Sequence, residues 1–285
     1  MEIIAVDATL GAVVRGVDLV QLDEAAFQTI QDAWHEYAVL VFKGQSLTSD
    51  EHLAFSRRFG RLERGLVKSS PRLLGHLSNT RRDGTVADAD SLQVRFNEGN
   101  QHWHSDSSYK RVGAKASLLS ARLVPDTGGE TEWADMRVAY DALEPRMQQW
   151  LADKVAVQSF VFSHTWHGGL ELLSQADLAE LPPVAHAIVQ EHPVTGRKSL
   201  FLGRHASHII GENEEHSRAL LKRLTEQACQ PPRTFKHTWQ PGDLALWDNR
   251  CVLHRGHPWP LQQARDMVRS TVAGDAPDNE WAESA

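Results

Sequence analysis

Short runs of β-branched and apolar residues, separated by turn sequences, recur along the chain and limit the folds open to it. Turns such as PDTGGET and QPGD interrupt these runs in the second half. Because few helical segments lie between them, the pattern favours an antiparallel barrel or sandwich over a parallel α/β sheet. We expect strands over 38–42, 117–124, 154–162, 198–203, 243–248 and 267–274.

Apolar residues at helical spacing predict a smaller number of helices, which we expect to act as packing elements. The first two follow the capping-type openings QLDEAAF and LTSDEHL. The sequence contains no internal repeat, low-complexity tract or linker, so we expect a single domain over 1–285. The predicted helices cover 24–37, 50–59, 138–151 and 214–228.

The charge and composition argue against several classes of partner. A net charge of -7 provides no basic field that would draw the chain onto nucleic acid or an anionic membrane. No apolar run approaches the roughly 18 residues of a membrane span, and the first residues lack the features of a secretory signal. We therefore expect a cytoplasmic protein. Cys229 and Cys251 lack CxxC spacing, and we expect two reduced thiols without a functional role.

The stretch NQHWHSDSSY contains a candidate metal site. His102, His104 and Asp106 stand at alternate positions, and would share one face of an extended strand. At about 3.3 Å per residue, the first and last would lie about 13 Å apart, whereas metal–ligand bonds are about 2 Å long. At most two adjacent members can therefore bind one ion. We favour His254, in WDNRCVLHRGHPW, as the third ligand.

Two histidines and one aspartate suit more than one metal. They match the facial triad of non-haem Fe(II) oxygenases, but three protein ligands with a bound water also suit catalytic zinc. A zinc hydrolase and a non-catalytic, cupin-like binding module are therefore alternatives. An isolated His-x-Asp pair is more often a surface or hydrogen-bonded pair, so further residues must decide.

Several ordered motifs resemble the taurine dioxygenase family of Fe(II)- and 2-oxoglutarate-dependent enzymes. Its aryloxyalkanoate (2,4-dichlorophenoxyacetate) dioxygenases are the members that the chain is most similar to, through WHSDSSY, ADMRVAYDAL, GRHASHI and LWDNRCVLHRG. The resemblance implies a mainly β fold with flanking helices around a double-stranded β-helix (jelly-roll, cupin-like) core. The motifs are WHSDSSY at 103–109, GGET at 128–131, WDNR at 247–250 and RDMVRST at 265–271.

Carried onto this sequence, the resemblance implies that His104, Asp106 and His254 bind Fe(II). It leaves His102 outside the coordination shell, in agreement with the distance argument. Asp106 is present, whereas related halogenases replace this carboxylate with a small residue. We therefore expect hydroxylation.

The basic residues near the end of the chain have a physical reason to be there. 2-Oxoglutarate can chelate iron through one end, which leaves its distal 5-carboxylate in need of a fixed partner, and a bidentate arginine suits it. Arg265 and Arg269 are four apart on a predicted strand, so one pocket could hold two anions. The resemblance assigns Arg265 and Thr131 to the 5-carboxylate, and Arg269 to an acidic group of the substrate.

Other residues carry weaker expectations. The resemblance suggests substrate contacts for Lys68, and Asn100 could contact substrate or cosubstrate; an exposed loop lysine and a turn-forming asparagine are the ordinary alternatives. His205 and His208 are expected to have structural or pocket roles. The remaining expectations are an orienting role for Arg250 and core packing for Trp103, Trp247 and Phe201.

The reaction implied consumes 2-oxoglutarate and O2, hydroxylates a small anionic organic substrate, and releases succinate and CO2. The resemblance favours an aryloxyalkanoic acid, for which hydroxylation beside the ether oxygen leads to cleavage into a phenol and glyoxylate. An alkylsulfonate (taurine-like) dioxygenase or a hydroxylase of a natural carboxylic acid is the alternative. A homo-oligomer is compatible with the sequence.

Overall fold

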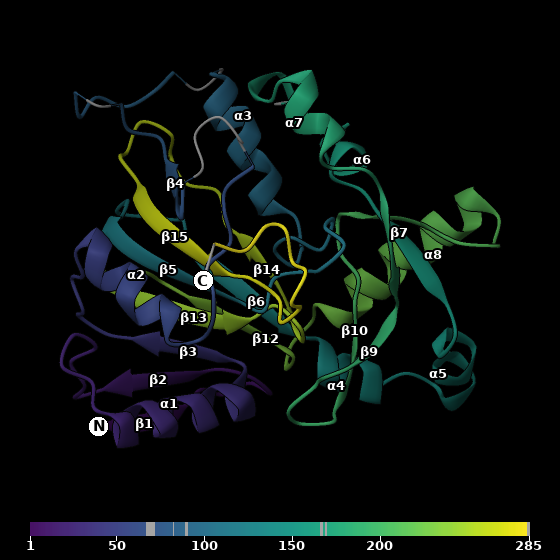
Figure 1. Ribbon diagram of the computed structural model, residues 1–285, viewed down its shortest axis with the longest axis horizontal. Helices are drawn as coiled ribbons and strands as arrows, with labels where there is room; N and C mark the ends of the chain where they lie inside the picture. The colour runs from purple at the N-terminus through teal and green to yellow at the C-terminus, as the bar shows by residue number, and fades with distance from the viewer. Residues whose placement is uncertain (67–71, 82, 89–90, 166–167, 169, 284–285) are drawn as a thin grey trace.

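The computed structural model describes residues 1–66, 72–81, 83–88, 91–165, 168 and 170–283. Its largest layer is a seven-stranded sheet in the order β1-β2-β3-β13-β5-β15-β4, seen in the left half of Figure 1. Neighbouring strands in it are antiparallel, except for β2 and β3. The strands are β1 (Glu2–Ala5), β2 (Ala12–Arg15), β3 (Val39–Phe42), β4 (Leu74–Ser78), β5 (Ala116–Leu123), β13 (Leu244–Asp248) and β15 (Asp266–Val272).

A second antiparallel sheet, in the order β12-β6-β14, packs against the large one. One cluster of buried side chains joins Leu119 and Trp247 of the large sheet to Trp133 and Val252 of the small sheet. The rings of Trp133 and Trp247 lie 5.9 Å apart between their centroids. The two sheets therefore share a core. The strands of the second sheet are β6 (Thr131–Asp135), β12 (Thr234–His237) and β14 (Val252–Gly256).

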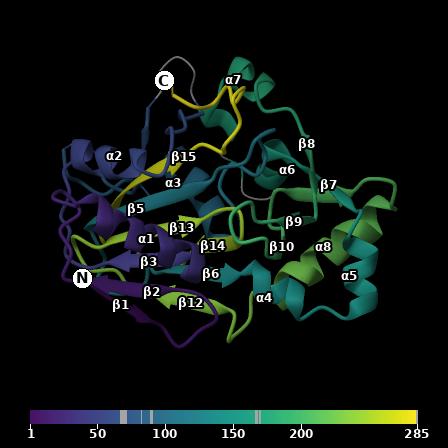
Figure 2. The same cartoon turned by 60° about the horizontal axis from the view of Figure 1, so that its bottom comes forward.

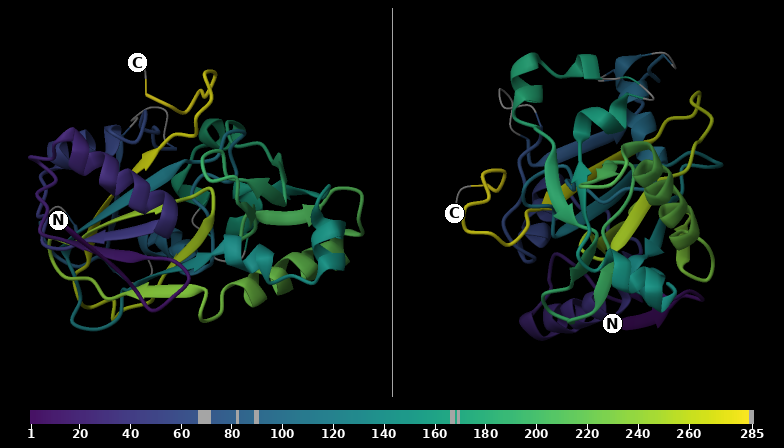
Figure 3. Two further views of the ribbon diagram at one scale, coloured as in Figure 1. Left: turned by 90° about the horizontal axis from the view of Figure 1, so that it is seen from below. Right: turned by 90° about the vertical axis from the view of Figure 1, so that its right-hand side faces the viewer.

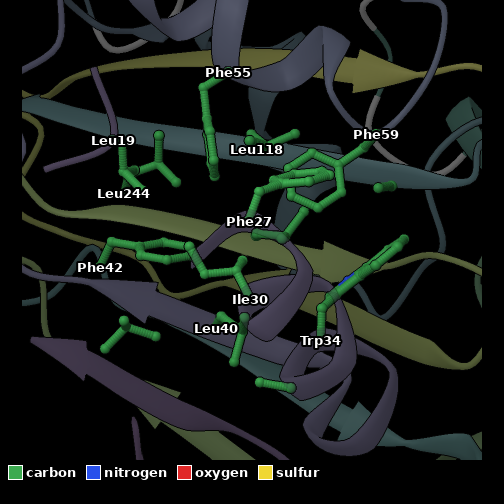
Figure 4. Close-up of a cluster of buried hydrophobic side chains, with 14 of the residues drawn as sticks. Leu19, Phe27, Ile30, Trp34, Leu40, Phe42, Phe55, Phe59, Leu118 and Leu244 are labelled. Carbon is green, nitrogen blue, oxygen red and sulfur yellow. The ribbon is translucent and has the colours of Figure 1, made fainter. Parts of the chain in front are cut away.

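Helices α1 (Glu24–Tyr37) and α2 (Ser49–Arg57) cover the opposite face of the large sheet. Figure 4 shows Phe27 and Trp34 of α1 and Phe55 of α2 packed among side chains of β3, β5 and β13. Strand β3 is apolar throughout because it is buried on both faces: Leu40 and Phe42 point toward the helices, and the alternate residues point toward the second sheet.

Helix α1 forms where the sequence predicts it. The Asp23 side chain caps its first turn by accepting a hydrogen bond from the backbone of Ala26. Phe27, Ile30 and Trp34 recur at a spacing of three and four residues, so their side chains form one buried stripe. The predicted boundaries of this helix and of α8 (Glu214–Ala228) are confirmed.

The segment from α4 to α8 lies to one side of the two main sheets (Figures 2 and 3). It contains a two-stranded sheet, β10-β9, and a three-stranded sheet, β11-β7-β8. Its strands are β7 (Val155–Gln158), β8 (Val184–Ala187), β9 (Val189–Glu191), β10 (Lys198–Leu200) and β11 (Ala206–Ile209). The helices not yet named are α3 (Leu92–Glu98), η1 (Gly99–Gln101), α4 (Met136–Asp141), α5 (Pro145–Leu151), α6 (Phe160–His164), η2 (Leu170–Leu172) and α7 (Gln175–Ala179).

For two elements, the boundaries predicted from the sequence are wrong. The helix predicted over 138–151 is divided into α4 and α5, because Pro145 lacks the backbone N–H that a continuous helix would need and instead begins α5. The strand predicted over 154–162 ends at Gln158. The Ser159 side chain then accepts a hydrogen bond from the backbone of Phe162 and caps a short helix, α6.

The architecture consists of mixed sheets with helices on their outer sides. The prediction of an antiparallel arrangement, instead of a parallel α/β sheet, is confirmed for the main sheets apart from the β2–β3 pair. Within the described residues, no helix has both the length and the apolar character needed to cross a membrane.

Candidate active site

His104 and His254 lie directly opposite each other at the edge of the second sheet. Their backbones exchange two hydrogen bonds, from the His104 nitrogen to the His254 oxygen at 3.0 Å and in the reverse direction at 2.8 Å. Residues paired in this way project to the same side. The two imidazole rings consequently meet, with centroids 4.1 Å apart.

Asp106 joins this pair because the chain turns immediately after His104. An extended strand over 102–106 would have placed His104 and Asp106 on one face, but the chain is not extended after His104. Residues 106–109 form a turn, and Ser107 has a φ of 55°. The Asp106 carboxylate oxygens lie 4.0 Å from His104 Nε2 and 3.7 Å from His254 Nε2. One potential ligand atom from each residue lies within 4.8 Å of the others, as the combination of a His-x-Asp pair with His254 predicts.

The surroundings of His104 leave one ring nitrogen as a candidate metal-binding atom. Its Nδ1 lies 2.7 Å from the carbonyl oxygen of His102, so Nδ1 carries the proton and Nε2 keeps its lone pair. Nε2 is buried and has no hydrogen-bond partner within the described part of the chain. A buried lone pair facing a carboxylate and a second imidazole fits a divalent transition metal.

Burial sets the protonation states that a metal site requires. It lowers the pKa of His104 well below its usual value, and it lowers the pKa of His254 to about 4. Burial acts to raise the pKa of Asp106, but the charge of Arg269 and the other polar neighbours outweigh it and hold that pKa well below its usual range. At neutral pH the site therefore contains two neutral imidazoles and one carboxylate.

Both oxygens of the Asp106 carboxylate are held by hydrogen bonds. Arg269 Nη1 donates to Oδ1 at 2.7 Å, and the Ser117 hydroxyl donates to Oδ2 at the same distance. A small inner cavity of about 50 Å³ adjoins the three potential metal ligands, and its lining includes His104, His254 and Arg269. The side chain of Arg269 is 27% exposed, so it both contacts Asp106 and lines this cavity. The sequence did not reveal this ion pair.

Arg265 immediately precedes β15 and lines the same cavity as Arg269, but its surroundings differ from those of Arg269. It is only 6% exposed, and none of the described carboxylates forms an ion pair with it. Its Nη2 donates to the Gly129 carbonyl at 3.1 Å, and its guanidinium lies 4.9 Å from the centre of the Trp259 ring. Burial lowers the pKa of Arg265 to about 10. A buried cation without an acidic partner is costly, so this geometry suits an anionic ligand.

Thr131, at the start of β6, faces this cavity as well. Its hydroxyl accepts a hydrogen bond from the indole N–H of Trp239 at 3.0 Å. The hydroxyl proton therefore remains able to donate to an acceptor in the cavity. The neighbouring Gly129 has a φ of 71°, and a Cβ atom at this position would lie 3.1 Å from Arg265 Nε. Glycine thus allows the backbone to approach the arginine closely.

The weaker candidates have different outcomes. Asn100, in η1, lines the cavity, whereas Lys68 lies outside the described residues. His205 is buried, with its ring 6.3 Å from that of His104, and His208 hydrogen-bonds to Ser207 on β11. Neither belongs to the group of three potential metal ligands.

Two of the three residues predicted to fill the core also make polar or charged contacts. Trp247 is buried, but it also lines the cavity and donates its indole N–H to Asn249. Trp103 is half-buried, with the Arg255 guanidinium over its ring, whereas Phe201 is buried as expected.

A second group of potential ligands, formed by His192, Asp248 and Cys251, is fully engaged in hydrogen bonds instead. His192 Nδ1 accepts from two backbone N–H groups, and its Nε2 then donates to Asp248 at 3.0 Å. Arg250 contacts both oxygens of Asp248, which fits its expected orienting role. With both ring nitrogens occupied, this group is a structural cluster. Cys251 and Cys229 are free, buried thiols.

A larger cavity adjoins the site on the outer side of Arg269. Its volume is about 370 Å³, and Arg269 lines it as well as the inner cavity. The wall of this outer cavity combines apolar and aromatic side chains with charged ones, which are Glu63, Arg64, Arg72, Lys110 and Arg269. Its apolar lining includes Leu66, Leu73, Phe96, Tyr109, Leu172 and Leu173.

The fold and the site together define a 2-oxoglutarate-dependent non-haem iron dioxygenase, which uses Fe(II), 2-oxoglutarate and O2. The family model described as "Taurine catabolism dioxygenase TauD, TfdA family" matches residues 3–271, and the chain belongs to this family. Membership sets aside the zinc-hydrolase and binding-module alternatives.

Among its relatives, the chain is 43% identical over 282 residues to (S)-phenoxypropionate/alpha-ketoglutarate-dioxygenase of Sphingobium herbicidovorans, covering 96% of this chain and 95% of that protein. It is 41% identical over 260 residues to alpha-ketoglutarate-dependent 2,4-dichlorophenoxyacetate dioxygenase of a Burkholderia species, covering 89% and 87%. The crystal structure of AAD-2 in complex with Mn(II) and N-oxalylglycine has a TM-score of 0.88 and 39% identity, and the match covers 97% of this chain and 99% of that one.

Proposed function

We propose that this enzyme oxidises aryloxyalkanoic acids and cleaves their ether bond. The observation that carries the proposal is Arg269, a partly exposed cation that lines both the inner cavity and the outer cavity, whose wall includes several apolar and aromatic side chains. An anion with an apolar aromatic body matches that arrangement. Relatives at 41–43% identity are named for phenoxypropionate and 2,4-dichlorophenoxyacetate, which are molecules of this kind.

His104, Asp106 and His254 would hold the iron. Their burial, the lone pair of His104 Nε2 and the ionised carboxylate of Asp106 support this assignment. When bound, Fe(II) with 2-oxoglutarate and O2 supplies the oxidising chemistry that replaces a C–H bond with C–OH, while 2-oxoglutarate becomes succinate and CO2. The contribution of the protein is to position the reactants and to exclude water.

Arg265 and Thr131 would bind the distal carboxylate of 2-oxoglutarate. The absence of an acidic partner for Arg265 among the described residues, and the donor proton of Thr131, support this role. Arg269 would bind the acidic group of the substrate with the part of its guanidinium that does not contact Asp106. Asn100 is a further candidate for contact with either ligand, and Lys68 for contact with the substrate.

The aryl group would lie in the outer cavity, against Phe96, Tyr109 and Leu173. With the acid held at Arg269, which contacts Asp106, the carbon between the acid and the ether oxygen would be the hydrogen-bearing carbon nearest the proposed metal ligands, so we expect hydroxylation there. Hydroxylation there produces a hemiacetal, and a hemiacetal of an aryloxyacetate collapses to a phenol and glyoxylate.

The two facing antiparallel sheets support a double-stranded β-helix (jelly-roll) as the core, within a single domain over 1–285. We infer a cytoplasmic enzyme that acts on a small organic anion and uses neither nucleic acid nor a membrane as a partner. A homo-oligomer remains compatible with this reading.

The test is release of succinate from 2-oxoglutarate in the presence of different substrates. We expect phenoxyacetate to give succinate and an equal amount of phenol, and its neutral methyl ester to react much more slowly. Equal rates for acid and ester would contradict the anion site. An alkylsulfonate or a natural carboxylic acid is the second candidate, and the sulfonate is supported by the 28% identity to a "Putative alpha-ketoglutarate-dependent sulfonate dioxygenase" of Schizosaccharomyces pombe. Succinate release with such compounds, and no phenol from any aryloxy acid, would establish that alternative.

A further inference from the structure

A buried chain of polar side chains lies behind the Asp106 carboxylate. Asn249 follows the end of β13, and Ser117 lies on β5, where the two strands pair with Trp247 opposite Ser117. Asn249 Nδ2 lies 2.9 Å from the Ser117 hydroxyl oxygen, which lies 2.7 Å from Asp106 Oδ2. The three side chains are at most 5% exposed. Water therefore has little access to replace any of these contacts.

The direction of the hydrogen bonds is fixed by the donors around Asn249. Its Oδ1 accepts from the indole N–H of Trp247 at 3.0 Å and from the backbone N–H of Asp106 at 3.2 Å. Both of these groups can only donate, so this atom is the oxygen and the other is the NH2 group. The NH2 group donates to Ser117, which leaves the Ser117 hydroxyl proton to donate to Asp106.

We propose that Asn249 is a positioning residue for the metal site and acts on Asp106 through Ser117. Asn249 supports Asp106 in two ways. Its side-chain oxygen accepts a hydrogen bond from the Asp106 backbone N–H, and its NH2 group orients the Ser117 hydroxyl that donates to the Asp106 carboxylate. Together these contacts fix both the turn and the side-chain rotamer that carry the ligand. Arg269 holds the other carboxylate oxygen, but it also faces the cavity and is open to a substrate. The Asn249–Ser117 pair is therefore the support that does not depend on substrate.

The inference rests on the proposed ligand role of Asp106, and metal affinity tests the two separately. We would titrate the apoprotein with Mn(II), without 2-oxoglutarate, and compare Ser117→Ala, Asn249→Ala and the double variant with the parent. Loss of a hydrogen-bonded partner of a metal ligand weakens binding by about 10- to 100-fold. We expect both single variants to lose about 10-fold or more. The double variant should lose less than the sum of the two single losses, because part of the effect of Asn249 passes through Ser117.

Ser105→Ala is the matched control. The Ser105 hydroxyl is buried in the same region and contacts Asn249, but it donates to the backbone carbonyl at 2.7 Å and does not contact the carboxylate. It should bind Mn(II) as the parent does. The Co(II)-loaded proteins give a second measurement: the visible ligand-field bands should change in Ser117→Ala and Asn249→Ala, and not in Ser105→Ala. Thermal unfolding of each apoprotein identifies a variant that has lost its fold.

Parental Mn(II) affinity in folded Ser117→Ala would overturn the inference. So would additive losses in the double variant, since these would show that Asn249 does not act through Ser117. If Asp106→Ala binds Mn(II) as tightly as the parent, the ligand assignment itself is wrong, and the positioning role is wrong with it.

Discussion

Arg265 and Arg269 are four positions apart, but their electrostatic surroundings in this site differ. Arg265 is buried beside a carbonyl and an indole ring, and no described carboxylate neutralises it. Arg269 is partly exposed and already paired with Asp106. A bound carboxylate would neutralise Arg265, whereas at Arg269 it would share the guanidinium with Asp106, the proposed metal ligand. Substitutions at the two positions should therefore differ in kind.

Arg265→Ala should raise the 2-oxoglutarate concentration required for half-maximal activity. Losing a charge-assisted pair costs on the order of 2–5 kcal/mol when the other charge is left unpaired. The measurement is the concentration dependence of succinate release at saturating substrate. If only the affinity for the primary substrate changes, the proposed roles of Arg265 and Arg269 are reversed.

Arg269→Leu should impair the use of acidic substrates much more than it impairs 2-oxoglutarate binding. The substitution also removes the 2.7 Å partner of Asp106 Oδ1, so metal affinity must be measured alongside. Steady-state kinetics with phenoxyacetate, at metal concentrations that saturate the variant, separate the two effects. An unchanged KM for the acid under those conditions would argue against the substrate role.

His104→Ala, Asp106→Ala and His254→Ala should each abolish turnover and weaken Fe(II) or Mn(II) binding. His102→Ala should keep most of the metal affinity, because His102 supports His104 through its backbone carbonyl, which the substitution retains. Anaerobic Fe(II) titration in the presence of 2-oxoglutarate, followed by the weak visible band of the chelate, measures this. Equal loss in His102→Ala would indicate that the wrong histidine was assigned.

The same residues show what sequence reasoning can reach. His104 and Asp106 stand out because a His-x-Asp pair is short and its chemistry is specific. Ser117 does not, since a serine in an apolar strand has no distinctive pattern, and its contact with Asp106 depends on the pairing of β5 with β13. The serine at 117 and the asparagine two positions after Trp247 are the corresponding signals in the sequence, and their role becomes clear only once β5 and β13 are paired.

At the scale of elements, α2 is attached to the large sheet by a polar cluster within an apolar layer. His52 on α2 hydrogen-bonds to Ser120 of β5 at 2.7 Å and to Ser270 of β15 at 2.9 Å, and Ser56 also reaches Ser270. Burial first, and then the charge of Arg122, lower the pKa of His52 to about 4. The helix therefore packs on the sheet with a neutral imidazole.

This cluster should make folding less stable in mild acid. Below its ordinary pKa of 6.5, His52 takes up a proton in the unfolded chain, but in the folded protein it does so only near pH 4. Stability should therefore be retained above pH 6.5 and lost as the pH falls toward 4, by on the order of 3 kcal/mol from this residue. Urea unfolding of apoprotein at several pH values should show a shallower decline for His52→Gln than for the parent.

The exposed residue His216 on α8 provides the control for that measurement. His216→Gln should follow the parent, since its side chain does not join an element to the sheet. A parental decline in His52→Gln would assign the acid sensitivity to other groups, of which His104 and His254 are the first candidates because burial lowers their pKa values too.

Elements whose signals are local were predicted well. The amphipathic stripes and caps of α1 and α8 lie within their own sequences, so their limits could be read directly. The division of 138–151 at Pro145 and the start of α6 after Ser159 also had local signals, a proline and a capping serine, which the apolar pattern concealed.

At the scale of the whole molecule, the order of strands could not be predicted from the residues alone. Strand β13 lies between β3 and β5, which occur about 200 and 125 residues earlier in the chain, and nothing in an apolar run specifies such distant partners. The family resemblance supplied what the pattern could not. It supported the choice of His254 as the third ligand and implied the fold that brings His254 beside His104.

The backbone bridge between His104 and His254 joins segments 150 positions apart. A metal ion held at both ends would act as a reversible cross-link across a loop of that length, and the unfolded chain offers no equivalent site. Mn(II) should therefore raise the unfolding temperature of the parent and slow its digestion by protease, and do neither for Asp106→Ala. During synthesis, the chain would not be able to hold its iron until residue 254 has left the ribosome and β14 has paired. Loading of the metal would thus be a late event in the life of each molecule, open to competition from whichever divalent ion is then most abundant.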